Sequence, residues 1–125
     1  MAFFDELAPV TVDEMLGEWE GGIVRTGHPG GRALGLIRWA GKRFRTAEDV
    51  APLMAYGPGG RRIRNPMMGA ARLRMVEYRG VVSGAMVYDR QPIIDHFRRV
   101  DDDTLLGAMD YKRVPRPLVF LLTRL

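Results

Sequence analysis

Short apolar runs, separated by polar connections, fill the second half of the chain. After Ala70 they read LRMVEYRG, VVSGAMVYD, PIIDHFRRV, TLLGAMD and PLVFLLTRL. Two of the connections are DRQ and the triplet Asp101–Asp103, which we read as a charged turn rather than a metal site. Strands at this spacing predict an antiparallel meander, whose usual architectures are a sandwich or a closed barrel. We favour the barrel because closure removes the unpaired strand edges that so apolar a sheet would expose.

The first half of the chain mixes helix, strand and turn signals. Thr11 followed by Glu14 fits a capping box that opens a short helix, and Gly17–Thr26 reads as a strand with glycine-permitted bends. In Arg32–Trp39 the spacing of the apolar residues predicts a helical segment that caps the open end of the barrel. Thr46–Asp49 predicts another capped helical turn.

These elements predict a mainly β fold, a small antiparallel up-and-down β-barrel with one or two short capping helices. A chain of 125 residues is the size of a single domain with one core. Within residues 1–125 we distinguish three parts by their patterns. They are a part with the helical cap (1–54), a flexible loop rich in glycine and proline (55–70) and the β-meander (71–125).

Composition narrows the classes of function. The absence of cysteine excludes disulfides and thiolate metal sites. The net charge is +4 and the bases are almost all arginine, with the densest run at Gly60–Arg64. A nucleic-acid binder would gather its bases on one surface, so we read this run as a solvated connection and expect no nucleic-acid partner. Neither a leader pattern nor an apolar run of membrane-spanning length is visible, which favours a cytoplasmic protein without a membrane span.

Two segments carry a resemblance to a known family. Gly17–Gly21, GEWEG, is a G-x-W-x-G motif. The segment from Leu73 onward, LRMVEYRG…PIIDHFRRVDDDTLLGAMD, resembles the companion domain that accompanies this motif in bacterial GXWXG-domain proteins. The resemblance covers both ends of the chain and leaves out the 55–70 loop. It implies a β-barrel-like domain and brings no activity with it.

The G-x-W near the amino terminus is also similar to the start of calycin-type barrels, which include lipocalins, fatty-acid-binding proteins and nitrobindin-like proteins. In those families the tryptophan plugs the closed end of the barrel beside a basic residue from a late strand. By that analogy Trp19 is a structural plug, with Arg124 or Arg116 as its cation–π partner. Nitrobindin-like proteins bind haem through a late-strand histidine, but neither His28 nor His96 matches that pattern, so we expect no cofactor.

The stretch Gln91–Val100, QPIIDHFRRV, places an acid and an imidazole side by side on a predicted strand. Neighbouring strand residues face opposite sides, so Asp95 shares a face with Ile93 and Phe97 while His96 lies on the other. The first face is more apolar, so Asp95 should point inward, where lost hydration raises the pKa of a carboxyl and suits it to acid–base chemistry. An Asp95 that is merely hydrogen-bonded inside the barrel, with no chemical role, fits the pattern equally well.

The same alternation gives further candidate catalytic groups. Glu77 qualifies as a second inward acid, and Tyr88 lies near a hairpin rim. His96 stays a candidate beside Asp95, although we expect it outside, where it would hold the hairpin together or meet a partner subunit. Two acids and a tyrosine around an apolar cavity suit proton transfer on a bound carbonyl compound. Without cysteine, and with Ser83 as the single serine, the chain predicts no nucleophilic triad.

The chain's eight methionines favour an adaptable apolar pocket, although core packing explains them as well. The expected ligand contacts are Trp39, Met54, Met67, Met68, Met75, Met86, Ile93, Phe97, Met109 and Phe120. The leading hypothesis is a barrel that binds a hydrophobic small molecule of lipid-, terpenoid- or polyketide-like character. One alternative is a cofactor-independent acid–base enzyme, such as a double-bond isomerase acting on a hydrophobic carbonyl compound. The other is a structural or interaction module with a filled barrel, and a homodimer is a possible assembly.

Overall fold

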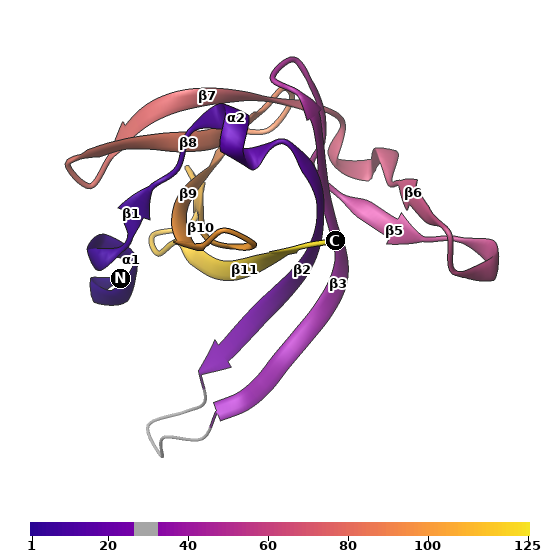
Figure 1. Cartoon of the computed structure of the whole chain (residues 1–125), viewed down its shortest axis with the longest axis horizontal. Helices are drawn as coiled ribbons and strands as arrows, with labels where there is room; N and C mark the ends of the chain where they lie inside the picture. The colour runs from indigo at the N-terminus through magenta and orange to yellow at the C-terminus, as the bar shows by residue number, and fades with distance from the viewer. Residues whose placement is uncertain (27–32) are drawn as a thin grey trace.

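In the computed structural model, antiparallel strands follow one another around a central core (Figure 1). The structure describes residues 1–26 and 33–125, and the side chains of those outside 23–38. The elements are, in chain order, α1 (Ala2–Glu6), β1 (Ala8–Pro9), α2 (Val12–Met15), β2 (Gly17–Thr26), β3 (Ala33–Thr46), β4 (Asp49–Ala51), β5 (Met54–Tyr56), η1 (Pro58–Gly60), β6 (Arg62–Arg64), η2 (Pro66–Met68), β7 (Ala71–Tyr78), β8 (Val81–Tyr88), β9 (Ile93–Asp101), β10 (Thr104–Tyr111) and β11 (Leu118–Arg124).

Eight of the strands close into a ring. Hydrogen-bonded neighbours run in the order β9, β10, β11, β2, β3, β4, β7 and β8, and β8 pairs back onto β9, which makes the arrangement barrel-like. The joint between β4 and β7 is the thinnest, with Val50 opposite Ala71 as its one paired position. The mainly β, antiparallel fold is confirmed, and so is each strand of the meander predicted after Ala70.

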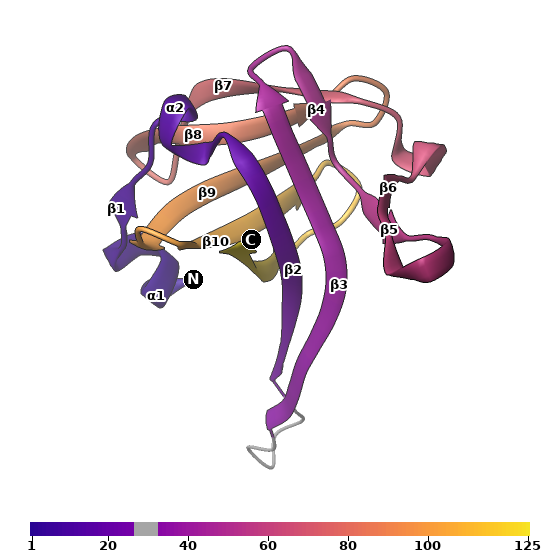
Figure 2. The ribbon, with the colours of Figure 1, turned by 45° about the vertical axis from the view of Figure 1, so that its right-hand side comes forward.

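The helix predicted for residues 32–39 is wrong. From Ala33 the chain runs as one strand, β3, to Thr46, and it pairs with β2 over nearly its whole length. This pairing satisfies the backbone hydrogen bonds of both strands, which outweighs a helical spacing of apolar residues. The resulting hairpin extends past the rest of the ring (Figure 1, Figure 2). The helical turn expected at Thr46–Asp49 is a tight turn between β3 and β4, in which Asp49 N–H donates to Thr46 Oγ1 at 3.0 Å.

Two short helices precede the ring. The capping box expected at Thr11 and Glu14 is present, because Glu14 N–H donates to Thr11 Oγ1 at 3.2 Å and Thr11 N–H donates to Glu14 Oε1 at 2.9 Å. It opens α2, which lies at the rim of the ring (Figure 1) and whose Met15 is buried in the core. No sequence signal singled out α1. In the part of the chain that the structure describes, no helix has the length and apolar character to cross a membrane.

The first helix, α1, covers part of the outer face of the ring. Its Phe4 packs against Leu106 and Ala108 of β10. The buried guanidinium of Arg98, on β9, donates hydrogen bonds to the carbonyl oxygens of Phe4 and Leu7, both at 3.1 Å. The last carbonyls of a helix lack partners within it, so this cation satisfies them and joins α1 to the sheet.

Residues 55–70, expected to be a flexible loop, contain a hairpin of β5 and β6 that lies outside the ring (Figure 2). Arg62, from the arginine-rich run, fastens this hairpin to the ring. Its Nη2 donates to the carbonyl oxygens of Trp19 at 3.0 Å and Ala40 at 2.6 Å, and its guanidinium pairs with Glu18. We predicted that this run is a solvated connection, and the structure shows that its Arg62 also has a structural role.

The GEWEG segment, Gly17–Gly21, packs its tryptophan between α2 and β11. Trp19 is fully buried, and its Nε1–H donates to the carbonyl oxygen of Met15 at 2.8 Å. The guanidinium carbon of Arg124 lies 4.2 Å from the centre of the Trp19 ring, and Arg124 Nη1 donates to the Leu16 carbonyl at 2.9 Å. The predicted cation–π contact of Trp19 with Arg124 is therefore present.

Candidate functional site

The two faces of β9 separate Asp95 from His96. Asp95 lies on the inner face, 1% exposed, and lines a pocket inside the ring. His96 lies on the outer face, where its ring stacks on that of Tyr78 with centroids 3.8 Å apart. Its Nε2 is 3.5 Å from Oδ2 of Asp110. Strand alternation thus predicted both sides correctly, but His96 is buried against Tyr78 within the chain rather than open to solvent.

The inner pocket has a volume of about 340 Å³ and mostly apolar walls. Strands β3, β8, β9, β10 and β11 contribute to it, together with the segment after β4 and the end of η2. The lining residues are Trp39, Lys42, Pro52, Leu53, Met68, Tyr88, Asp95, Met109, Leu118 and Phe120. An apolar enclosure of this size with a few convergent polar groups is the usual form of a small-molecule site.

Lys42, Tyr88 and Asp95 form a polar cluster in the wall of this pocket. Lys42 Nζ lies 3.2 Å from Asp95 Oδ2 and 3.4 Å from Tyr88 Oη, and it donates a 2.8 Å hydrogen bond to the carbonyl oxygen of Pro52. Tyr88 Oη lies 3.4 Å from the same carboxylate oxygen. Lys42 is 3% exposed and Asp95 1%. Desolvating such a pair is costly, and apolar residues often replace one without loss of stability, so the cluster calls for a role beyond packing.

A β-bulge brings Lys42 into the pocket. Trp39 and Lys42 are three positions apart, so a regular strand would place them on opposite faces. In β3, however, two residues, Ala40 and Gly41, oppose a single residue of β2. The extra residue returns Lys42 to the inner face. Gly41 adopts a φ of +89° there, in the region that favours glycine.

Burial changes the acidity of all three groups in the cluster. Loss of hydration lowers the pKa of Lys42 and raises the pKa of Asp95, while the attraction between the two opposes both shifts. Burial and the neighbouring Asp95 raise the pKa of Tyr88. The low-dielectric surroundings thus favour a neutral amine beside a protonated carboxyl, whereas the attraction between the two charges favours the ion pair.

Two polar atoms in the pocket wall have no hydrogen-bond partner among the described residues. They are Asp95 Oδ1 and Trp39 Nε1. Buried polar atoms are nearly always paired with protein or water, so unpaired ones at a pocket wall indicate where a polar group of a ligand, or a water, would bind. The indole N–H is a donor and the carboxylate oxygen an acceptor. The residues that line the pocket thus include one unpaired donor and one unpaired acceptor.

The residues predicted to contact a ligand divide into several groups. Those that line the pocket are Trp39, Met68, Met109 and Phe120. Met86 and Phe97 are fully buried in the adjoining core, and Met54 lies in a separate core cluster. Met67 and Met75 are exposed at the surface, so neither one contributes to the pocket.

Of the predicted catalytic groups, Tyr88 and Asp95 meet in the pocket and Glu77 does not. Glu77 is exposed on β7, near the turn into β8. β8 pairs with β9 only from Ala85 onward, and β4 pairs with β7 only at Ala71, so the far end of the β7–β8 hairpin projects past the ring. Strand alternation places Glu77 on the inward side of β7, but the interior of the ring ends before this position.

Sequence reasoning missed four residues of the pocket, Lys42, Pro52, Leu53 and Leu118. A signal for Lys42 existed, because a glycine inside a strand pattern, here Gly41, is typical of a bulge that reverses the alternation. The helix predicted for residues 32–39 hid it. No local pattern distinguishes the other three, which reach the pocket from connections and from the first position of β11.

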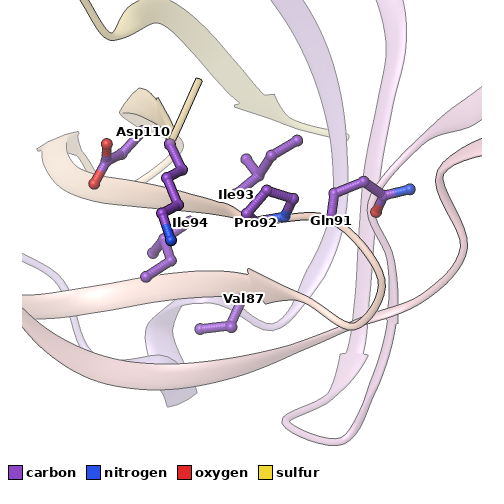
Figure 3. A pocket seen from close by; sticks show the side chains of 7 residues that line it. Val87, Gln91, Pro92, Ile93, Ile94 and Asp110 are labelled. Carbon is purple, nitrogen blue, oxygen red and sulfur yellow. The ribbon is translucent and has the colours of Figure 1, made fainter. Parts of the chain in front are cut away.

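A second pocket, of about 430 Å³, lies at the start of β9 on the outside of the ring (Figure 3). Val87 and Ile94, paired across β8 and β9, form its apolar part, with Asp110 and Lys112 beside them. Ile93, one of the predicted ligand contacts, borders this pocket as well as the core. Asp110 and Lys112 are exposed, so water competes for both, and the inner pocket is the stronger candidate site.

Within residues 1–26 and 33–125, no group of three or more histidine, aspartate or glutamate side chains is placed to hold a metal ion. The Asp101–Asp103 triplet forms the turn between β9 and β10, where Asp101 Oδ1 accepts a 2.9 Å hydrogen bond from Asp103 N–H. His28, considered for haem, lies outside the described residues.

Comparison with protein families matches the chain in two parts. Residues 2–60 match a model described as GXWXG protein, and residues 69–124 match a domain of unknown function, DUF4334. Among solved structures, the chain is similar to a protein from Thermomonospora curvata, with 48% sequence identity and a TM-score of 0.87 over 99% of this chain and 84% of that one. A comparison with curated proteins finds no match.

Proposed function

The chain belongs to the GXWXG proteins that carry the DUF4334 domain, and we propose that it binds an apolar small molecule in the inner pocket. One observation carries the proposal, an apolar pocket of about 340 Å³ with a buried polar cluster in its wall. A fold alone does not imply a function, so the proposal rests on this site.

The chemistry of the walls supports a ligand with a large hydrophobic body and one polar group. Trp39 and Phe120, whose rings pack edge to face at 6.2 Å, would contact the body. Each Å² of apolar surface removed from water contributes roughly 25 cal/mol, so the body would provide most of the affinity. Trp39 Nε1 would donate to a hydroxyl or carbonyl oxygen, and Asp95 Oδ1 would accept from a hydroxyl group. Lipid-, terpenoid- and polyketide-like compounds have this character.

Two neighbouring methionines give a matched test of this proposal. Met68 lines the pocket, whereas Met67 is 74% exposed and does not. We expect Met68→Trp to fill the pocket and weaken binding of farnesol by about tenfold or more, the equivalent of ~1.4 kcal/mol. Met67→Trp adds the same side chain outside and should leave binding unchanged. Isothermal titration measures both affinities, and native mass spectrometry of the purified protein detects any ligand that it retains.

Equal affinities for the two variants, or no binding of farnesol and related apolar alcohols by the unchanged protein, would contradict the proposal. A loss of binding in Met67→Trp would point to the outer surface of η2 instead of the interior.

Acid–base catalysis in the same pocket is the second candidate function. The observation that favours it is Asp95, whose pKa burial raises and whose Oδ1 is unpaired at the pocket wall. Such a carboxyl suits proton transfer on a hydrophobic β,γ-unsaturated ketone, with Tyr88 beside it to stabilise an enolate. We expect the unchanged protein to form the conjugated isomer, followed by ultraviolet absorbance, and Asp95→Asn to lose at least about a hundredfold in rate. If both forms bind the ketone and neither converts it, catalysis is excluded and the binding function alone remains.

A further inference from the structure

Lys42 has the surroundings of a reactive amine rather than those of a surface lysine. Its Nζ lies in the wall of the inner pocket, with the ring centres of Trp39, Phe120 and Tyr88 at 5.1, 5.4 and 5.8 Å. The chain contains one other lysine, Lys112, which is exposed beside the outer pocket. Lysines become nucleophilic when an apolar pocket removes their hydration, because the charged ammonium form then loses its advantage.

We propose that Lys42 joins an apolar aldehyde or ketone to the protein as an imine, with Asp95 as the proton donor to the departing oxygen. This inference rests on the proposed binding function and assigns a chemical class to the polar group of its ligand. An alcohol would occupy the same pocket reversibly, whereas a carbonyl compound would become covalently attached.

The neighbours of Lys42 supply what the reaction requires. The carbonyl oxygen of Pro52, at 2.8 Å, accepts one N–H and holds the amine in place. Asp95 Oδ2, at 3.2 Å, is close enough to take a proton from the amine and return it during the reaction. Burial lowers the pKa of Lys42 and raises that of Asp95, which favours the arrangement with a free amine and a protonated carboxyl. Trp39, whose Nε1 has no hydrogen-bond partner among the described residues, lines the same pocket.

The reaction balances within the pocket. The neutral amine of Lys42 attacks the carbonyl carbon, the C–N bond forms, and one amine proton passes to the oxygen to give a carbinolamine. The carboxyl of Asp95 then protonates this hydroxyl, the C–O bond breaks, and one water leaves. The product is a protonated imine, whose positive charge lies beside the carboxylate of Asp95. Amine, carbonyl compound and carboxylic acid thus become iminium, carboxylate and water, with no oxidant or reductant needed.

Borohydride trapping tests this proposal in the unchanged protein. Cinnamaldehyde is an apolar aldehyde, and cinnamyl alcohol is its matched control, because it has the same body and cannot form an imine. We expect sodium cyanoborohydride with cinnamaldehyde near pH 7 to add one cinnamyl group to Lys42, located by peptide mass spectrometry. Lys112 in the same molecule serves as an internal control and should react at least about tenfold less, because it is exposed to water and lies outside the apolar pocket. Excess cinnamyl alcohol should suppress the labelling of Lys42 and leave any labelling of Lys112 unchanged.

Variants separate the pocket from the surface. Lys42→Met should remove the label from the pocket, and Lys112→Arg should leave labelling of Lys42 unchanged. Because the comparison of the two lysines is made within one unmodified protein, the test does not depend on the folding of Lys42→Met.

The outcomes distinguish this inference from the function on which it rests. If titration shows that cinnamyl alcohol binds in the inner pocket, while cyanoborohydride labels Lys112 or the amino terminus and not Lys42, the imine is excluded and the binding function stands. If neither compound binds and Lys42 stays unlabelled, both are contradicted. Labelling of Lys42 that the alcohol fails to suppress would also overturn the proposal, since it would not depend on the pocket.

Discussion

At the scale of single residues, the buried charged side chains of this protein differ in the partners that they contact. Arg98 is held on the outer face by carbonyl oxygens at the end of α1 and by the ring of Phe4, which joins α1 to the sheet, although its Nη2 has no hydrogen-bond partner among the described residues. Lys42 contacts the carbonyl oxygen of Pro52 and the carboxylate of Asp95, whose Oδ1 has no hydrogen-bond partner among the described residues. A buried pair that is incompletely satisfied contributes little to stability, which supports a role for it in binding or chemistry.

The stability of variants at this pair tests that interpretation. Lys42→Met leaves Asp95 buried without its cation, and we expect a loss of about 3–5 kcal/mol in the free energy of unfolding near neutral pH. The double variant Lys42→Met/Asp95→Leu leaves no buried charge and should be as stable as the unchanged protein, or more stable by about 1–4 kcal/mol. Urea denaturation measures both. A double variant no better than the single one would assign the pair a structural role instead.

The deficit of Lys42→Met should also depend on pH. Burial raises the pKa of Asp95 above its unfolded value, and the cation that opposes this shift is absent in the variant. A carboxyl whose pKa is higher in the folded state contributes stability at pH values below its pKa in the unfolded state. This stability is lost as the pH rises through its pKa in the folded state. The deficit should therefore be smallest near pH 4 and grow toward neutral pH, which denaturation curves across that range would detect.

At the scale of elements, the bulge in β3 decides which side chains enter the pocket. Gly41 makes it possible in two ways, through its φ of +89° and through the close approach of the Trp19 carbonyl oxygen, with which a Cβ would overlap. Gly21 of β2, which is paired with Trp39, leaves room for the indole of Trp39, with which a Cβ would overlap. Gly41 and Gly21 thus set the positions of Lys42 and Trp39 in the wall of the pocket.

Gly41→Ala should disrupt this arrangement more than a comparable change elsewhere. Gly80 provides the control, because its φ of +82° is similar and nothing lies near the position of an added Cβ. We expect Gly80→Ala to cost about 1–2 kcal/mol through backbone strain alone. Gly41→Ala should cost about 1–3 kcal/mol more through the clash, and farnesol binding should weaken as Lys42 and Trp39 move. Equal losses of stability in urea, with binding retained, would mean that the bulge does not position the pocket.

At the scale of the whole molecule, the ring separates two environments that lie on either face of β9. The inner face holds the pocket with Asp95, and the outer face is covered by α1 and carries His96 under Tyr78. Trp19, with Arg124 over its ring, and the hairpin held by Arg62 connect the parts of the chain around this ring. The binding site that we propose therefore lies on the inner face.

The sequence by itself determined the strands of the meander, the capping box at Thr11 and the inward face of Asp95. These features depend on short-range patterns, namely turn residues, capping side chains and strict alternation, which the chain carries locally. The Trp19–Arg124 contact came from resemblance to other barrels, and the structure bears it out.

Only the tertiary structure decided what Asp95 faces. The pairing of β2 with β3 turned a predicted helix into a strand, and its bulge placed Lys42 beside Asp95, 53 positions along the chain and 3.2 Å away in space. The limits of the ring left Glu77 outside, although its face was predicted correctly. Register, bulges and the ends of the enclosed interior arise from contacts between distant strands, so no local pattern contains them.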